Sequence, residues 1–128
     1  MEQKAKGMRK NIVQEQLGKD LREIKNLEKK NLIIAYEPVW AIGTGNYCQP
    51  EEALEMIKFI KEIFSLNFPN SDLKVLYGGS VDPQNIANYL KYPEIDGALV
   101  GGASIKINEF KKIINEVSRA VKTESAQK

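Results

Sequence analysis

The sequence is poor in cysteine, in long apolar runs and in net charge, and each shortage excludes a class of protein. The one cysteine, Cys48, cannot form an internal disulfide, which fits a reducing cytosol. No apolar run reaches the roughly 18 residues that suggest a membrane span, and no signal-peptide pattern follows Met1. With 19 basic and 17 acidic side chains the net charge is +2, so charge alone indicates no nucleic-acid or membrane partner. We therefore expect a cytoplasmic protein.

The most informative segment runs from Leu32 to Gly45 and combines a strand, a carboxylate and an apolar loop. Its apolar or aromatic residues 32–36 predict a parallel strand that is covered on both faces. Pro38 lacks an N–H donor and holds Glu37 in an extended conformation, so the strand must end there. A loop with so many apolar side chains predicts a lid that closes over a ligand and excludes water. The lid comprises Pro38, Val39, Trp40, Ala41 and Ile42, followed by Gly43, Thr44 and Gly45.

Further helices and strands alternate along the chain. Apolar spacings of three to four residues predict amphipathic helices, and short apolar runs predict strands. The expected helices cover about 10–28, from Pro50 to a loop at 67–71, from the N-cap Asp82 to about Leu90, and about 108–121; the other strands cover 73–77 and 97–100. This alternation predicts an α/β fold of parallel strands with right-handed crossovers.

Two polar segments are assigned to the surface. The basic run at Lys4, Lys6, Arg9 and Lys10 is interleaved with acidic and amide residues, so we expect a solvated helix face. Residues 122–128 are expected to form a frayed polar tail.

The carboxyl ends of the three predicted strands carry the candidate site. Parallel strands end on the same face, which would bring Glu37 close to the glycine pairs at 78–79 and 101–102. A carboxylate that apolar side chains cover becomes a stronger base, and glycines let backbone N–H groups approach an anion. The alternatives are an exposed turn carboxylate and ordinary tight turns.

Three motifs carry a resemblance to a known family. They are Tyr-Glu-Pro-Val-Trp-Ala-Ile-Gly-Thr-Gly at 36–45, Leu-Tyr-Gly-Gly-Ser-Val at 76–81 and Leu-Val-Gly-Gly-Ala-Ser at 99–104. Together with the helix residues 7–17, they resemble triosephosphate isomerase over about residues 2–120. A complete barrel of this kind has about 250 residues. The resemblance therefore implies a partial TIM (β/α)8 barrel, approximately helix 5 through helix 8 with three parallel strands, and residues 1–128 as a carboxyl-terminal portion.

The resemblance also implies roles for individual residues. Glu37 would shuttle a proton between two carbons of a triose phosphate through an enediolate, as in glycolysis and gluconeogenesis. Main-chain N–H groups would bind the phosphate, and a latch would hold the lid closed without any metal or cofactor. The implied phosphate donors are Gly43, Ser80, Gly101 and Gly102, and the implied latch residues are Tyr77 and Ser80. Trp40 would move with the lid or fill a core gap, and Tyr77 could instead be a packed ring with a wet hydroxyl.

The sequence departs from this family in two respects. It contains no histidine, whereas the family polarises the substrate carbonyl with a histidine and uses a lysine and an asparagine from the first strand. Asn46-Tyr47-Cys48 replaces the usual Lys-Thr-Ala or Lys-Val-Ala hinge, which puts lid closure in doubt.

The missing groups decide what we expect of the chain by itself. It should be inactive until an amino-terminal half is supplied, and the full-length family forms homodimers. The alternative is a non-catalytic phosphate-binding half-barrel or complementation partner. The outer strands would each have an open edge, so the isolated chain is expected to aggregate, oligomerise or be only partly ordered.

Overall fold

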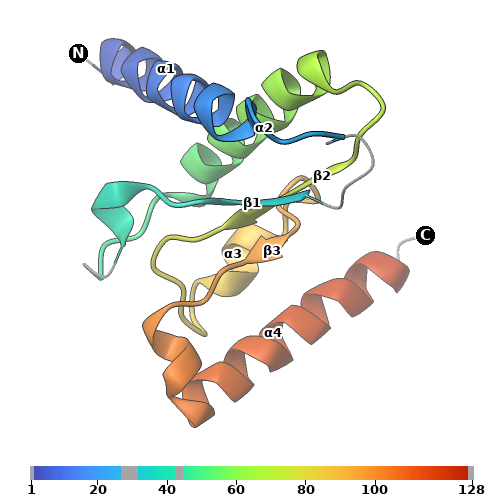
Figure 1. The fold of residues 1–128 in the computed structure, drawn as a ribbon. Coiled ribbons are helices and arrows are strands. Elements are labelled where there is room, and N and C mark those ends of the chain that lie inside the picture. Colours follow the sequence, from blue (N-terminus) through green and yellow to red (C-terminus); the bar gives the residue numbers. More distant parts are fainter. Residues whose placement is uncertain (1, 27–31, 43–44, 127–128) are drawn as a thin grey trace.

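The computed structural model describes residues 2–26, 32–42 and 45–126, with the side chains of 5–26, 32–42 and 45–121. Over these residues the chain is an α/β fold with four α-helices and three parallel strands, as Figure 1 shows. The elements are α1 (Glu2–Leu21), β1 (Leu32–Tyr36), η2 (Val39–Ala41), α2 (Pro50–Asn67), β2 (Leu73–Tyr77), α3 (Ile86–Leu90), β3 (Gly97–Ala98), η3 (Gly102–Ile105) and α4 (Ile107–Ala126). The predicted α/β class and the three strands are confirmed.

The sheet has the order β1-β2-β3, and all pairs are parallel. Leu32 pairs with Leu73 at one end and Tyr36 with Tyr77 at the other, so β1 and β2 end together. Strand β3 is shorter than the predicted 97–100, although the Leu99 N–H still donates to the Tyr77 carbonyl over 2.8 Å. The three carboxyl ends therefore lie along one edge of the sheet.

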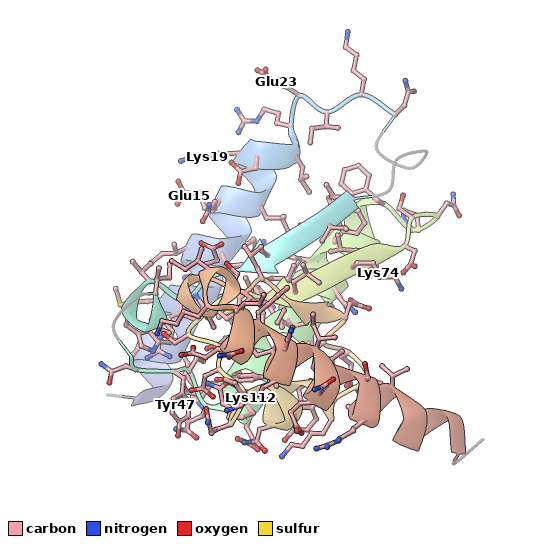
Figure 2. All side chains as sticks on the ribbon, turned by 90° about the horizontal axis from the view of Figure 1, so that it is seen from below. Glu15, Lys19, Glu23, Tyr47, Lys74 and Lys112 are labelled. Atoms are coloured by element: carbon pink, nitrogen blue, oxygen red, sulfur yellow. The ribbon has the colours of Figure 1, made fainter. Side chains whose placement is uncertain are left out.

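The core lies on one face of the sheet, and the other face is open. Tyr36, Val75 and Tyr77 point from the strands into a cluster that includes Ile57 and Phe64 of α2. On the opposite face, 61% of Ile33 is exposed, and Lys74, labelled in Figure 2, is also exposed. The prediction that β1 is covered on both faces is therefore wrong for this chain.

Helix α1 begins and ends earlier than the predicted 10–28. Its last turn closes with a bond from the Arg22 N–H to the Lys19 carbonyl (3.4 Å) and one from the Ile24 N–H to the Leu21 carbonyl (3.2 Å). Asn26 then has a φ of 56°, which ends any helical path. Ile24 packs on the core from this turn rather than from a helix, and residues 27–28 lie outside the described part.

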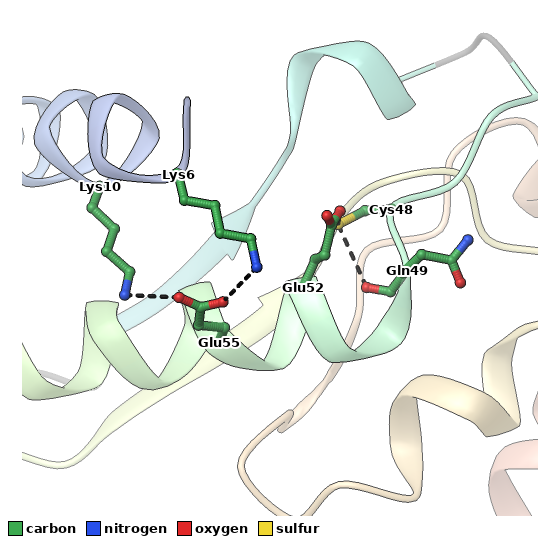
Figure 3. A network of polar contacts seen from close by, with 6 residues as sticks. All are labelled: Lys6, Lys10, Cys48, Gln49, Glu52 and Glu55. Atoms are coloured by element: carbon green, nitrogen blue, oxygen red, sulfur yellow. Dashed lines mark hydrogen bonds and ion pairs between the residues drawn. The ribbon is translucent and has the colours of Figure 1, made fainter. Parts of the chain in front are cut away.

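The basic run in α1 contacts α2. Lys6 and Lys10 form ion pairs with Glu55 of α2, at 3.6 and 2.9 Å (Figure 3). Their side chains remain 41% and 35% exposed, so the predicted surface face is kept, with the addition of these pairs to α2. The side chain of Lys4 lies outside the described residues.

The later helices follow the predictions with shifted boundaries. Helix α2 begins at the predicted Pro50 and buries the apolar side chains whose spacing predicts it: Ala53, Met56, Ile57, Ile60 and Phe64. Helix α4 continues through Ala126, beyond the predicted end at 121, so most of the expected tail has a helical backbone. Of the apolar residues Phe110, Ile113, Ile114 and Val117 in α4, only Ile113 is buried, because α4 packs mainly on α3 and η3. No helix among the described residues has the length and hydropathy of a membrane span.

Candidate active site

A cavity of about 500 Å³ lies where the three strands end. Glu37 follows β1, Gly78 and Gly79 follow β2, and the loop from Leu99 to Gly102 follows β3. The parallel register brings these segments to one edge, and all of them contribute to the same cavity. Its lining includes Glu37, Ile42, Gly45, Tyr47, Gly78, Gly79, Ser80, Asp82, Leu99, Gly101, Gly102, Lys106 and Glu109. The structure thus brings the predicted carboxylate and both glycine pairs together.

Glu37 reaches this cavity because Gly78 leaves room for its side chain. The Gly78 N–H donates to the Tyr36 carbonyl over 2.9 Å, which continues the ladder past the ends of both strands. A Cβ atom at Gly78 would lie 2.7 Å from the Glu37 Cγ atom, so only glycine admits the carboxylate in this position. Glu37 is exposed in this structure, and the lid does not cover it.

The lid begins with the single turn η2, which the Ala41 N–H closes by donating to the Pro38 carbonyl (2.8 Å). Pro38 and Ala41 are buried, whereas Val39 and Ile42 are exposed. Trp40 is 41% exposed, so it does not fill a core gap in this chain. Gly43 and Thr44 lie outside the described residues, and Gly45 has a φ of 74°, which favours glycine.

Ser80 binds the lid directly. Its hydroxyl donates to the Ala41 carbonyl over 2.6 Å, and its backbone N–H donates to the same oxygen over 2.9 Å. The first contact is a hydrogen bond to the lid backbone, as a latch would need, and the latch role of Ser80 stays a prediction. The second occupies the N–H group that the family resemblance assigns to the phosphate, so phosphate binding by Ser80 would require this bond to break.

Two stacked tyrosines hold the chain where it leaves the lid. The Tyr77 hydroxyl accepts from the Cys48 N–H over 3.2 Å, and the Tyr89 hydroxyl donates to the Cys48 carbonyl over 2.5 Å. The two rings lie 4.0 Å apart at 15°, and both are fully buried. The alternative of a wet Tyr77 hydroxyl is therefore wrong. Tyr47, one residue earlier and labelled in Figure 2, is 49% exposed and lines the cavity.

Burial governs the ionisation of this group. It raises the pKa of Tyr77 and that of Tyr89 above the ordinary phenol value. Burial, followed by the nearby Glu52 carboxylate, raises the pKa of Cys48 to about 12. The thiol is therefore protonated at neutral pH, which suits a structural role and not a nucleophile.

The loop after β3 is more open. A Cβ atom at Gly101 or Gly102 would meet no atom within 4 Å. The Ser104 N–H donates to the Gly101 carbonyl over 2.9 Å and starts the turn η3. Lys106 follows that turn and pairs with Glu109 over 3.2 Å, and both side chains reach the cavity.

Two residues that hold the site escaped the sequence analysis. Tyr89 is one, because only the stacking on Tyr77 shows its role. Asn85 is the other, since its amide accepts from the Asp82 N–H (2.9 Å) and donates to the Ser80 carbonyl (3.1 Å). The predicted cap Asp82 accepts from the N–H groups of Gln84 and Asn85, both at 2.8 Å, one turn before α3. The Asp-Pro-Gln-Asn run at 82–85 was the available signal.

No group of three or more histidine, cysteine, aspartate or glutamate side chains among the described residues could hold a metal ion.

Comparison with known proteins connects this edge of the sheet to a family. A sequence model described as triosephosphate isomerase matches residues 1–117. The chain belongs to the triosephosphate isomerase family. It is 45% identical over 114 residues to the triosephosphate isomerase of a Nostoc species, a match that covers 89% of this chain and 44% of the relative.

Two other triosephosphate isomerases give the same picture. That of Carboxydothermus hydrogenoformans is 43% identical over 117 residues, which are 89% of this chain and 47% of the relative. That of Leptospira biflexa is 47% identical over 113 residues, which are 84% of this chain and 45% of the relative. The chain thus spans somewhat less than half the length of these triosephosphate isomerases.

Proposed function

We propose that this chain provides the base, the lid and part of the phosphate-binding edge of a triosephosphate isomerase. The reaction would interconvert dihydroxyacetone phosphate and D-glyceraldehyde 3-phosphate. The observation that carries the proposal is the single cavity at the strand ends, which Glu37, Gly79 and Gly102 all line. Membership of the triosephosphate isomerase family supports the same reaction class.

In this proposal Glu37 is the catalytic base. It would take a proton from one carbon of the triose phosphate and return it to the neighbouring carbon, through an enediolate. Its position beyond the end of β1, with space provided by Gly78, supports this role because the carboxylate faces the cavity. The lid of residues 38–45 would close over the carboxylate and exclude water during the transfer.

The phosphate would bind at the Gly101-Gly102 pair, at Ser80 and at Gly43. Open space around Gly101 and Gly102 supports a close approach of an anion to the backbone. The N–H of Ser80 would exchange its bond to Ala41 for a phosphate oxygen, so lid position and phosphate binding would be linked. Gly43 keeps its proposed role as a donor, although it lies outside the described residues.

Turnover would need groups that this sequence does not supply. The sequence has no histidine, and oriented electrophilic groups typically contribute orders of magnitude to such reactions. We assign the chain to helix 5 through helix 8 of the barrel, so an amino-terminal half would provide the carbonyl polariser and cover the open face at Ile33. A homodimer of complete barrels and a cytoplasmic location are further expectations from the family.

The test is reconstitution. The chain would be mixed with the amino-terminal half of a full-length relative, and conversion of D-glyceraldehyde 3-phosphate would be followed. We expect activity from the mixture and none from either part. Glu37→Gln should lower kcat by about 10³-fold or more, since the base is lost. Glu62→Gln, an exposed change on α2, is the matched control and should leave kcat unchanged.

The alternative is a half-barrel that binds phosphate without turnover. The absence of histidine favours it for the chain by itself. Titration with inorganic phosphate, followed by NMR, would show saturable shifts at Gly101 and Gly102 while the reconstituted mixture stays inactive. Activity that survives Glu37→Gln would contradict the proposed base instead.

A further inference from the structure

Helix α1 contacts the lid through a pair of side chains that the proposed function does not use. The guanidinium carbon of Arg9 lies 4.5 Å from the centre of the Trp40 ring. A cation within about 6 Å of an indole centre is attracted to the ring face. Both residues line a groove of about 450 Å³ between α1, β1 and the lid. Arg9 therefore contacts the lid at Trp40.

Arg9 projects from a helix face that is fixed to the rest of the molecule. Lys6 and Lys10, three residues before and one residue after it, both pair with Glu55 of α2 (Figure 3). The Lys10 ammonium also lies 5.4 Å from the Phe59 ring of α2. These contacts join α1 to α2 on either side of Arg9 along the helix.

Other contacts hold the described part of the lid and the chain that follows it. Ser80 binds the carbonyl of Ala41, and the tyrosine pair binds both backbone groups of Cys48, three residues after the lid. Arg9 adds a contact at Trp40, the residue just before Ala41. It also lines a small cavity together with Cys48.

We propose that Arg9 is a positioning residue that holds the lid in the described conformation through the face of Trp40. The inference rests on the proposed function only in treating residues 38–45 as a lid. A partly exposed contact of this kind shifts a two-state equilibrium by about fivefold, so its loss would raise the population of other lid conformations by that factor.

The only tryptophan of the sequence is Trp40, so its fluorescence reports on the lid alone. The experiment measures the anisotropy decay of Trp40 in the full chain without substrate. Arg9→Met keeps the length of the side chain and removes the charge, whereas Arg9→Lys keeps a cation. Arg22→Met, at an exposed arginine just beyond α1, is the matched control.

We expect Arg9→Met to about double the amplitude of the nanosecond depolarisation, since the lid then samples more orientations. Arg9→Lys should fall between Arg9→Met and the parent chain, and Arg22→Met should equal the parent. Far-UV circular dichroism should be unchanged in all four, which separates lid motion from loss of helix. If Arg9→Met lost helix signal, Arg9→Gln would replace it.

Either of two results would overturn the proposal. One is a decay in Arg9→Met that matches the parent, and the other is a decay in Arg9→Lys that matches Arg9→Met. The measurement needs no turnover, so an inactive reconstituted mixture would leave it standing. Conversely, an active mixture with an unaltered Trp40 decay in Arg9→Met would remove the role of Arg9 and keep the proposed reaction.

Discussion

The strand end at Gly78-Gly79 is tightly packed, whereas the loop at Gly101-Gly102 is open. A Cβ atom at Gly79 would overlap the Tyr77 hydroxyl, and one at Gly78 would crowd the Glu37 side chain. A Cβ atom at Gly101 or Gly102 would meet nothing within 4 Å. Contacts within this chain therefore explain why glycine stands at 78 and 79. Space for a ligand would explain why glycine stands at 101 and 102.

The packed end also fixes the lid, and the open end does not. Tyr77 and Tyr89 hold Cys48, and Ser80 holds Ala41, all within the segments that adjoin Gly79. Around Gly102 the chain makes the short turn η3 and then enters the exposed start of α4. The strand end at Gly78-Gly79 thus holds the lid in place, and the loop at Gly101-Gly102 remains open for a ligand.

Gly79→Ala is expected to change the free energy of unfolding the most, and so to distinguish the packed strand end from the open loop. The new methyl group would displace the buried Tyr77 hydroxyl and weaken the bonds to Cys48, so we expect the free energy of unfolding to fall by about 3 kcal/mol. Urea unfolding followed by circular dichroism measures this change. The control is Gly18→Ala in α1, where a Cβ atom meets nothing, and it should stabilise the chain by up to about 1 kcal/mol. A fall below about 1 kcal/mol in Gly79→Ala would contradict the packed end.

An intermediate effect is expected at alkaline pH. The buried Cys48 keeps its proton until its pKa of about 12, while the thiol of the unfolded chain ionises at its ordinary, lower pKa. The unfolded chain therefore binds fewer protons above about pH 9, and stability falls by about 1.4 kcal/mol per pH unit from this group. The contribution of the neutral Cys48 thiol to the free energy of unfolding is thus fully present at neutral pH and is lost as the pH rises.

Cys48→Ala tests this through the slope of its free energy of unfolding against pH, and not through its stability at any one pH. The parent chain should lose stability between pH 9 and 11 more steeply than the variant does, since the tyrosines contribute equally to both. Equal slopes in urea unfolding would show that the thiol is not held in its neutral form.

The smallest effect on stability is expected for Gly102→Ala. Open space at this position predicts a change within about 0.5 kcal/mol in the same urea experiment. Binding of inorganic phosphate, followed by NMR, should nevertheless weaken, because the methyl group would face the cavity. A large loss of stability would make the two strand ends alike and remove the contrast.

The strands could be predicted because their signals are local. Residues 32–36 and 73–77 are short apolar runs that end at Pro38 or at a glycine, and each forms a strand with those bounds. Helix α2 was predictable for the same reason, since Pro50 and the apolar spacing mark it. The contacts of α1 with α2 were not, because Lys6 and Lys10 pair with Glu55, which is distant in the sequence.

The residues of the site also fall into those that the sequence could predict and those that it could not. Glu37, Gly79 and Gly102 could be predicted to share one edge, because parallel strands must end together. Tyr89 could not, since its role comes from a bond to Cys48 that no spacing announces, and for Asn85 the sequence offered only the Asp-Pro-Gln-Asn run at 82–85.

The sequence by itself determined the alternation of helices and strands, the family and the residues that stand at the strand ends, because these follow from side-chain periodicity and from local turn chemistry. Only the tertiary structure decided which face of the sheet is covered, how Ser80 and the tyrosine pair hold the lid, and that Arg9 lies on Trp40. The physical reason is that such contacts join residues 31 to 41 positions apart, and their geometry exists only once the sheet and its helices have packed.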